Sequence, residues 1–156
     1  MANFVFTVAM GRSAELYNRV KTADPSAAEL VVILLAASGI EADATLRDVA
    51  TCAALVAGAT NEATNTGYAK KVLAAGALAA LDPDEANDRT DLDLPDQTWT
   101  ALAADGTGAV AKLVVAYDPV GSQTMSDMIP MTAHDFAVTP DGSDVTAQIA
   151  NFFRAQ

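Results

Sequence analysis

The stretch LVVILL, residues Leu30–Leu35, decides the fold class of this chain. It is apolar on both faces, rich in β-branched residues and shorter than a typical helix, so it predicts a central strand of a sheet. The stretch KLVVAY, Lys112–Tyr117, has the same character, with Val114 and Val115 on opposite faces. We therefore expect a sheet at the centre of the fold.

Residues that favour turns recur along the chain and separate segments that have the length of β-strands. The turns are Asp24-Pro25, Ser38-Gly39, Asn65-Thr66-Gly67, Asp82-Pro83-Asp84, Asp105-Gly106, Asp118-Pro119 and Pro140-Asp141-Gly142. This rhythm favours a sandwich or barrel over a helical bundle. A further strand is predicted at Thr98–Ala101, beginning after Pro95. The pattern of Tyr68–Leu73 is ambiguous but favours a strand, and Arg12–Val20 fits either a helix or a strand, of which we favour the strand. The prediction is a mainly β, sandwich-like fold in a single domain, residues 1–156.

One segment has the spacing of a helix. In ATLRDVATCAALVAG, Leu46, Val49, Ala53 and Val56 recur on one helical face. Thr45 with Asp48 resembles a capping box, and Gly58 suits the end of a helix. We predict one short helix at about 45–57.

Acidic residues dominate the charge. The chain has 20 Asp and Glu against 9 Lys and Arg, for a net charge of −11. Nucleic-acid binders need clustered basic residues, so neither nucleic acid nor an anionic membrane is expected as a partner. The longest apolar run is far shorter than the roughly 20 residues that cross a bilayer. No charge precedes the apolar residues after Met1, so no secretory signal is expected either.

Seven acidic residues lie between Asp82 and Asp96, opposed only by Arg89. We expect a solvated surface loop at about 82–96, because like charges keep a segment extended. Two alternatives stay open: an irregular calcium site, since oxygen ligands are plentiful, and a hydrolase that uses a pair of carboxylates. The EF-hand pattern fails, because Ala86, Asn87 and Asp93 stand where other ligands or Gly are needed.

The only histidine lies in HDFAVTPDGSDVTAQ, His134–Gln148, close to Asp135, Asp141, Ser143 and Asp144. Apolar residues alternate on both sides of the Pro-Asp-Gly turn, which is typical of a hairpin. A hairpin would place His134 away from Ser143, and a triad needs both groups within hydrogen-bond reach. We therefore predict no catalytic residues and no enzyme.

Cofactor and metal motifs are also weak. Gly106–Ala111 matches the letters of a dinucleotide fingerprint, but a strand is predicted after it where a helix is required. Cys52 is the only cysteine, with no basic neighbour in the predicted helix, so it is expected to be a packing residue. No cofactor and no metal ligand are predicted.

Both ends of the chain carry large aromatic residues: Phe4 and Phe6 near one end, Phe152 and Phe153 near the other. Termini are usually poorly ordered unless they are tied down. We expect strands docked in a sheet, with arms buried against a neighbouring molecule as the alternative. These four phenylalanines are the candidate protein-interface residues.

Five groups of residues, taken in order, resemble a known kind of protein. They are RSAELYNRVKTADPSAAELVVILL, TNTGYAKKVL, DLDLPDQTWTA, KLVVAYDP and IPMTAHDFAVTPDGSDVTAQIANFFRA. Together they resemble small virion structural proteins of tailed bacteriophages, particularly phages of actinobacteria, of the head-decoration or minor-capsid class. The resemblance covers most of the chain, and its most specific parts are Asp96–Trp99 and the Pro-Asp-Gly-Ser-Asp turn. It carries no catalytic motif.

The resemblance implies a protein that binds the major capsid protein on the exterior of the capsid and stabilises the shell. It also implies a homo-oligomer, most commonly a trimer, assembled in the host cytoplasm. A tail or neck structural protein is the alternative, since the same β-sandwich would serve there.

Overall fold

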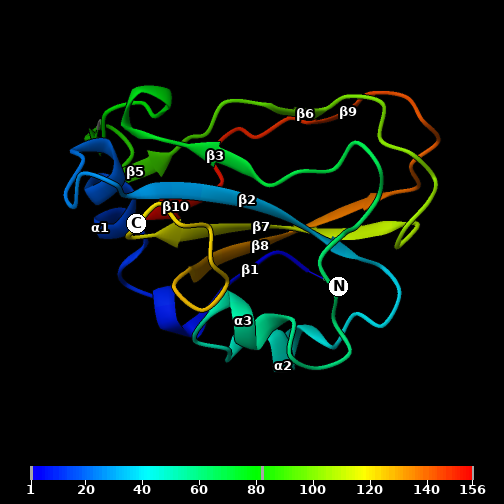
Figure 1. Cartoon of the computed structure of the whole chain (residues 1–156). Helices are drawn as coiled ribbons and strands as arrows, with labels where there is room; N and C mark the ends of the chain where they lie inside the picture. The colour runs from blue at the N-terminus through cyan, green and yellow to red at the C-terminus, as the bar shows by residue number, and fades with distance from the viewer. Residues whose placement is uncertain (1, 82, 156) are drawn as a thin grey trace.

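A five-stranded antiparallel sheet forms the centre of the protein in the computed structural model, which describes residues 2–81 and 83–155 (Figure 1). Its strand order is β1-β8-β7-β2-β3. The strands are β1 (Phe4–Val5), β2 (Glu29–Ala36), β3 (Lys71–Leu73), β7 (Val110–Asp118) and β8 (Ile129–Val138). The mainly β fold expected from the sequence is confirmed.

The two strands predicted from their apolar runs, β2 and β7, pair along their whole length, from Glu29 opposite Asp118 to Ala36 opposite Val110. Both are buried on both faces, which explains why their sequences do not alternate with polar residues. Val114 and Val115 point into separate cores, as predicted. The central sheet therefore has an apolar layer on each side.

One side of this sheet is covered by two smaller sheets and a helix (Figure 1). The first small sheet, in the order β10-β5-β4, contains β4 (Pro83–Asp84), β5 (Arg89–Leu92) and β10 (Phe153–Ala155). The second pairs β6 (Gln97–Trp99) with β9 (Val145–Ala147). Helix α1 (Ser13–Lys21) and the 3-10 turn η2 (Ala75–Ala77) complete this layer. Trp99, Tyr17 and Leu92 are fully buried here.

The other side is covered by two short helices, α2 (Asp43–Arg47) and α3 (Cys52–Leu55), which lie below the sheet in Figure 1. Leu46 and Leu55 from these helices pack against Val31 and Ile33 of β2. The 3-10 turn η1 (Thr7–Ala9) follows β1 and contacts β8. The architecture is thus a β-sandwich on one side and a sheet covered by helices on the other.

The single helix predicted at about 45–57 is replaced by two short ones, α2 and α3, which residues 48–51 separate. The chain breaks between them because the backbone N–H groups of Cys52 and Ala53 donate to the carbonyl oxygens of Met128 and Met125. Thr51 caps the second helix by accepting from the N–H of Ala54. These tertiary bonds replace the continuous i to i−4 ladder.

The strand predicted for Arg12–Val20 is wrong, because this segment forms α1, the longest helix among the described residues. Leu16, Tyr17 and Val20 are its buried apolar residues, at helical spacing. The Tyr17 hydroxyl donates toward the carbonyl oxygens of Ala79 and Asp93, which attaches the helix to the outer layer.

The hairpin predicted around Pro140-Asp141-Gly142 is also wrong. Gly142 does adopt the positive φ that such a turn requires, at 93°. The strands on either side do not pair with each other: β8 pairs with β7 and β1, whereas β9 pairs with β6. The segment is a crossing from the central sheet to the outer layer, and alternation alone does not reveal which partner a strand takes.

The acidic stretch predicted as a loop at 82–96 contains secondary structure. Residues 83–92 form the β4–β5 hairpin, and β5 pairs with β10. Leu92 and Leu94 are buried, which anchors the stretch to the core. Asp82 lies outside the described residues.

Asn65 holds together the loops at one end of the sandwich. Its side-chain amide donates to the carbonyl oxygens of Ala103, Asp105 and Gly108 at 2.8–2.9 Å, and its oxygen accepts from Thr107 Oγ1. Gly106 lies so close to the backbone of Thr64 that a Cβ there would sit 2.6 Å from its carbonyl oxygen. The glycine-rich turn at 106–108 is therefore a packing feature and is followed by β7, the strand predicted there.

Replacing Asn65 with alanine should lower the free energy of unfolding by about 1–3 kcal/mol, because buried carbonyl groups lose their donor. Denaturant unfolding followed by circular dichroism measures this change. The matched control is Asn61→Ala, since exposed Asn61 makes a single local bond to Ala59. Equal effects of the two substitutions would contradict the role given to Asn65.

Candidate functional site

The groups around the only histidine are not arranged as a catalytic triad. Nε2 of His134 lies 2.9 Å from Oγ1 of Thr132, two residues away on the same face of β8. Ser143 instead donates to Asp141, through its hydroxyl at 2.6 Å and its backbone N–H at 3.0 Å. The carboxylate of Asp144 accepts from the backbone of Ala101. Each of these polar groups has a structural partner of its own, and these partners do not join His134 to Ser143.

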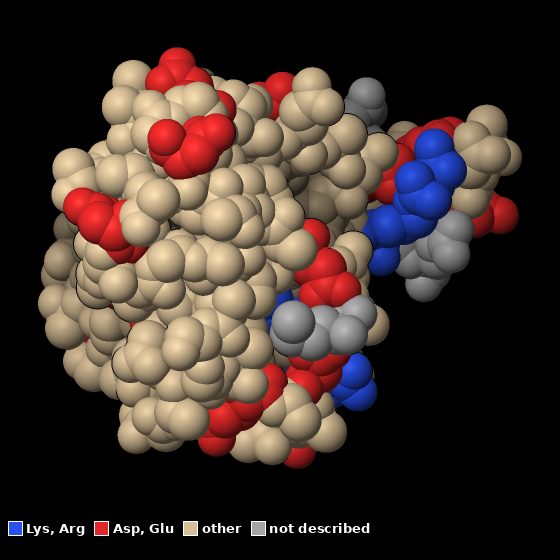
Figure 2. Space-filling model, turned by 90° about the vertical axis from the view of Figure 1, so that its right-hand side faces the viewer, with Lys and Arg blue, Asp and Glu red and all other residues tan. Residues whose placement is uncertain are grey.

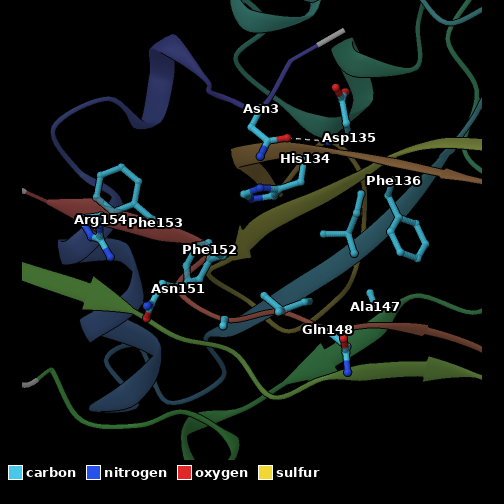
Figure 3. A pocket seen from close by; sticks show the side chains of 13 residues that line it. Asn3, His134, Asp135, Phe136, Ala147, Gln148, Asn151, Phe152, Phe153 and Arg154 are labelled. Atoms are coloured by element: carbon cyan, nitrogen blue, oxygen red, sulfur yellow. Dashed lines mark hydrogen bonds between the residues drawn. The ribbon is translucent and has the colours of Figure 1, made fainter.

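His134 does line a cavity of about 420 Å³, between β8 and the chain segment that leads into β10 (Figure 3). Its ring lies near the side chains of Asn3 and Phe152, while Asp135 projects to the other side of the strand. The remaining lining is mixed polar and apolar: Leu113, Asp135, Phe136, Ala147, Gln148, Ile149, Ala150, Asn151, Phe153 and Arg154. Among the described residues, the imidazole has the hydroxyl of Thr132 as its hydrogen-bond partner and not that of Ser143.

The surroundings of His134 disfavour its charged form. Burial, and secondarily the nearby charge of Lys112, hold the pKa of His134 below its ordinary value of 6.5. The folded protein therefore binds a proton at this site less readily than the unfolded chain. The contribution of neutral His134 to the stability of the folded protein is fully present above pH 6.5, the pKa in the unfolded chain. This contribution is lost as the pH falls through the lower pKa of the folded state.

We expect the free energy of unfolding to decrease between pH 7 and pH 5, before the carboxylates titrate. His134→Gln should flatten this part of the stability profile, because the substituted side chain carries no proton equilibrium. Urea unfolding at several pH values compares the two proteins. A profile of His134→Gln as steep as that of the unmodified chain would contradict the assignment.

The four phenylalanines proposed as interface residues pack within the protein. Phe4, Phe6 and Phe152 are buried, and Phe153 is half-buried. The rings of Phe4 and Phe6 contact each other edge to face, with 5.1 Å between their centroids, and the ring of Phe152 packs beside Tyr17. Strands β1 and β10 are paired into sheets, so the expectation of docked terminal strands is confirmed. In this conformation the rings contribute mainly to the core.

Cys52, the first residue of α3, is buried in the core on the helix-covered side of the central sheet. Burial raises the pKa of its thiol to about 12, so the reactive thiolate is disfavoured. Its position agrees with the packing role predicted from the sequence.

Two arginines, one in the hairpin and one in β10, neutralise part of the negative charge of the β4–β5 hairpin. Arg89 Nε lies 3.3 Å from carboxylate oxygens of both Asp84 and Asp91, and Arg154 donates to Asp91 at 2.6 Å. The hydrogen bond from Arg154 is the main cause that lowers the pKa of Asp91. In residues 2–81 and 83–155, no three His, Cys, Asp or Glu side chains gather in a way that could hold a metal ion.

The most unusual polar group is Lys112, which the sequence pattern predicts only as part of a strand. Its side chain is 0 % exposed. The ammonium nitrogen Nζ lies 2.6 Å from Oδ1 of Asp135, 3.1 Å from Oδ1 of Asp43 and 3.1 Å from the carbonyl oxygen of Ala2. The ring of Phe4 covers it, with 5.3 Å from Nζ to the ring centroid. A lysine inside an otherwise apolar buried strand was the signal available in the sequence.

Three elements position this group. Lys112 lies in β7, directly opposite Asp135 in β8, and Asp43 is the first residue of α2. Partial burial raises the pKa of Asp43, but hydrogen bonds from Ala2 and Lys112 outweigh burial and hold the pKa below its ordinary value. The N–H of Asp135 also donates to Asn3. The group thus attaches residues 2–4 to the central sheet.

Comparison of the chain with known protein families, with curated proteins and with solved structures finds no match. Among the described residues, no helix has the length and apolar character needed to cross a membrane.

Proposed function

We propose that this chain is a bacteriophage structural protein of the capsid-decoration or minor-capsid class, with the major capsid protein as its partner. It acts by binding alone, on the outside of the shell, as a homo-oligomer for which a trimer is the favoured state. The proposal rests on the sequence resemblance and is supported by the form and charge of the domain.

The structural observation that supports the proposal is a pair of exposed valines at and near one edge of the central sheet. Strand β3 is the last strand of the central sheet, and Val72 on it is 38 % exposed. Val120, in the loop after β7, is 54 % exposed. Lys70 joins the two regions, because its Nζ donates to the carbonyl oxygen of Gln123 in that loop. The unpaired backbone groups of an edge strand can pair with another chain, and exposed apolar side chains beside them can add to such a contact.

The charge of the surface suits a role outside a DNA-filled shell. With a net charge of −11, the domain is repelled by phosphate backbones. Figure 2 shows one face on which acidic side chains outnumber basic ones and lie among uncharged residues. Interface cores favour uncharged side chains and leave charge at the rim.

A binding assay tests the proposal. Val72→Glu combined with Val120→Glu should weaken binding to capsids that lack this protein by about tenfold or more, roughly 1.4 kcal/mol per factor of ten. Cosedimentation with such capsids measures the bound fraction, and circular dichroism checks the fold.

Met10→Glu is the control, since it places one of these carboxylates on another exposed apolar residue. Met10 follows η1, which contacts β8 on the far side of β7 and β2 from β3. Failure of the unmodified protein to bind capsids would contradict the proposed function, and equal losses for both variants would contradict the role of this edge.

A further inference from the structure

The buried lysine, the two carboxylates and the aromatic ring described above have the arrangement needed for an internal covalent bond. The amine donor and a carboxyl acceptor lie within hydrogen-bond reach, and a second carboxylate contacts the same amine. From this geometry we infer that Lys112 and Asp135 form an intramolecular isopeptide bond, with Asp43 as the proton relay. This inference is independent of the proposed function.

The reacting atoms are already placed together. Nζ of Lys112 is 2.6 Å from Oδ1 of Asp135, and that oxygen is bonded to the carbon that the amine attacks. Groups fixed in this way react with effective concentrations of about 10⁵–10⁸ M in favourable cases. Strands β7 and β8 hold the two residues as a cross-strand pair, so the folded sheet provides this proximity.

Two protons leave the nitrogen, and Asp43 relays the second. One ammonium proton passes to Oδ1 of Asp135 along the 2.6 Å hydrogen bond, so a neutral amine attacks Cγ of a neutral carboxylic acid. Once the N–C bond has formed, Oδ1 of Asp43, 3.1 Å from Nζ, accepts the second proton from the nitrogen. Asp43 then returns the proton to the departing oxygen. Its other oxygen, Oδ2, accepts from the backbone N–H of Ala2 at 2.6 Å, which fixes its orientation.

The reaction is balanced without any oxidant or cofactor. One N–C bond forms and one C–O bond of Asp135 breaks. Of the three protons on the Lys112 nitrogen, one remains on the amide and two leave with the oxygen as water. Asp43 begins and ends as a carboxylate, and the positive and negative charges of the reacting pair disappear together.

The surroundings favour the amide product. Lys112 is sealed from solvent by Phe4 and the strands, and keeping charges in such a place is costly. The side chain of Asp135 is 40 % exposed, so the released water has a path to the solvent. The product would join two strands covalently and fix the sheet beneath residues 2–4.

Intact-mass spectrometry of the purified, denatured full chain tests the inference. We expect a mass lower than that of the sequence by one water molecule, and a proteolytic digest containing a branched peptide that joins Lys112 to Asp135. Lys112→Arg and Asp43→Ala should each restore the full mass. Lys70→Arg, which alters another lysine paired with a carboxylate, should leave the mass deficit unchanged.

The mass of the unmodified chain decides the matter even if a variant fails to fold. A full sequence mass after prolonged incubation of the folded protein would overturn the inference. A branch between Lys112 and Asp43 would overturn the assignment of donor, acceptor and relay. A deficit that persists in Lys112→Arg would show that another reaction causes it.

Discussion

Lys112→Ala should lower the free energy of unfolding by about 3–5 kcal/mol, the effect of removing one partner from a buried ion pair. The substitution leaves the carboxylates of Asp43 and Asp135 beside each other without a cation, in a protein that already carries a net charge of −11. It also removes the donor to Ala2. Where the isopeptide bond inferred above has formed, the substitution removes that covalent link in place of the Lys112–Asp135 ion pair.

Guanidinium unfolding followed by circular dichroism measures the change. The control is Arg12→Ala, which removes an exposed cation 3.9 Å from Glu15 and should change stability by less than about 1 kcal/mol. A cost below 1 kcal/mol for Lys112→Ala would contradict the structural role assigned to this side chain.

Trp99→Ala should cost about 3–5 kcal/mol, as large-to-small substitutions of core aromatics do. Trp99 is fully buried, its Nε1 donates to the carbonyl oxygen of Ala69 at 2.8 Å, and its ring packs beside Phe136. The ring belongs to the two-stranded β6–β9 sheet, and an isolated pair of strands is only marginally stable in water. The outer layer therefore depends on this packing.

Circular dichroism is the appropriate probe, because Trp99 is the only tryptophan and fluorescence would lose its signal. Trp99→Phe is the matched control: it retains a ring in the core and loses only the indole donor and part of the volume, so its cost should be smaller. Similar costs for the two substitutions would contradict the packing argument.

The sequence predicted the parts of the fold in which local pattern and burial agree. Strands β2 and β7 are apolar on both faces because they lie inside the sheet with a core on each side. Helix α1 was predicted as a strand although Leu16, Tyr17 and Val20 have helical spacing. In so short a segment, the mixture of apolar and polar residues also fits the alternating pattern of a strand.

Other features depend on contacts that local pattern does not contain. The break between α2 and α3 follows from backbone bonds to residues 125 and 128. Strand β9 alternates as predicted, but its partner β6 is set by the tertiary fold. Likewise, Lys112 is recognisable as unusual within its strand, whereas its approach to Asp43 and Asp135 requires the folded sheet and α2.

Under the proposed function a phage encodes this chain, and electron cryomicroscopy of its intact virions tests that function most directly. We expect density that fits this domain on the outer surface of the capsid, in a copy number set by the symmetry of the shell and with an exposed sheet edge turned toward the capsid protein. Absence of the domain from the particle, or a few copies confined to the tail, would contradict the proposal.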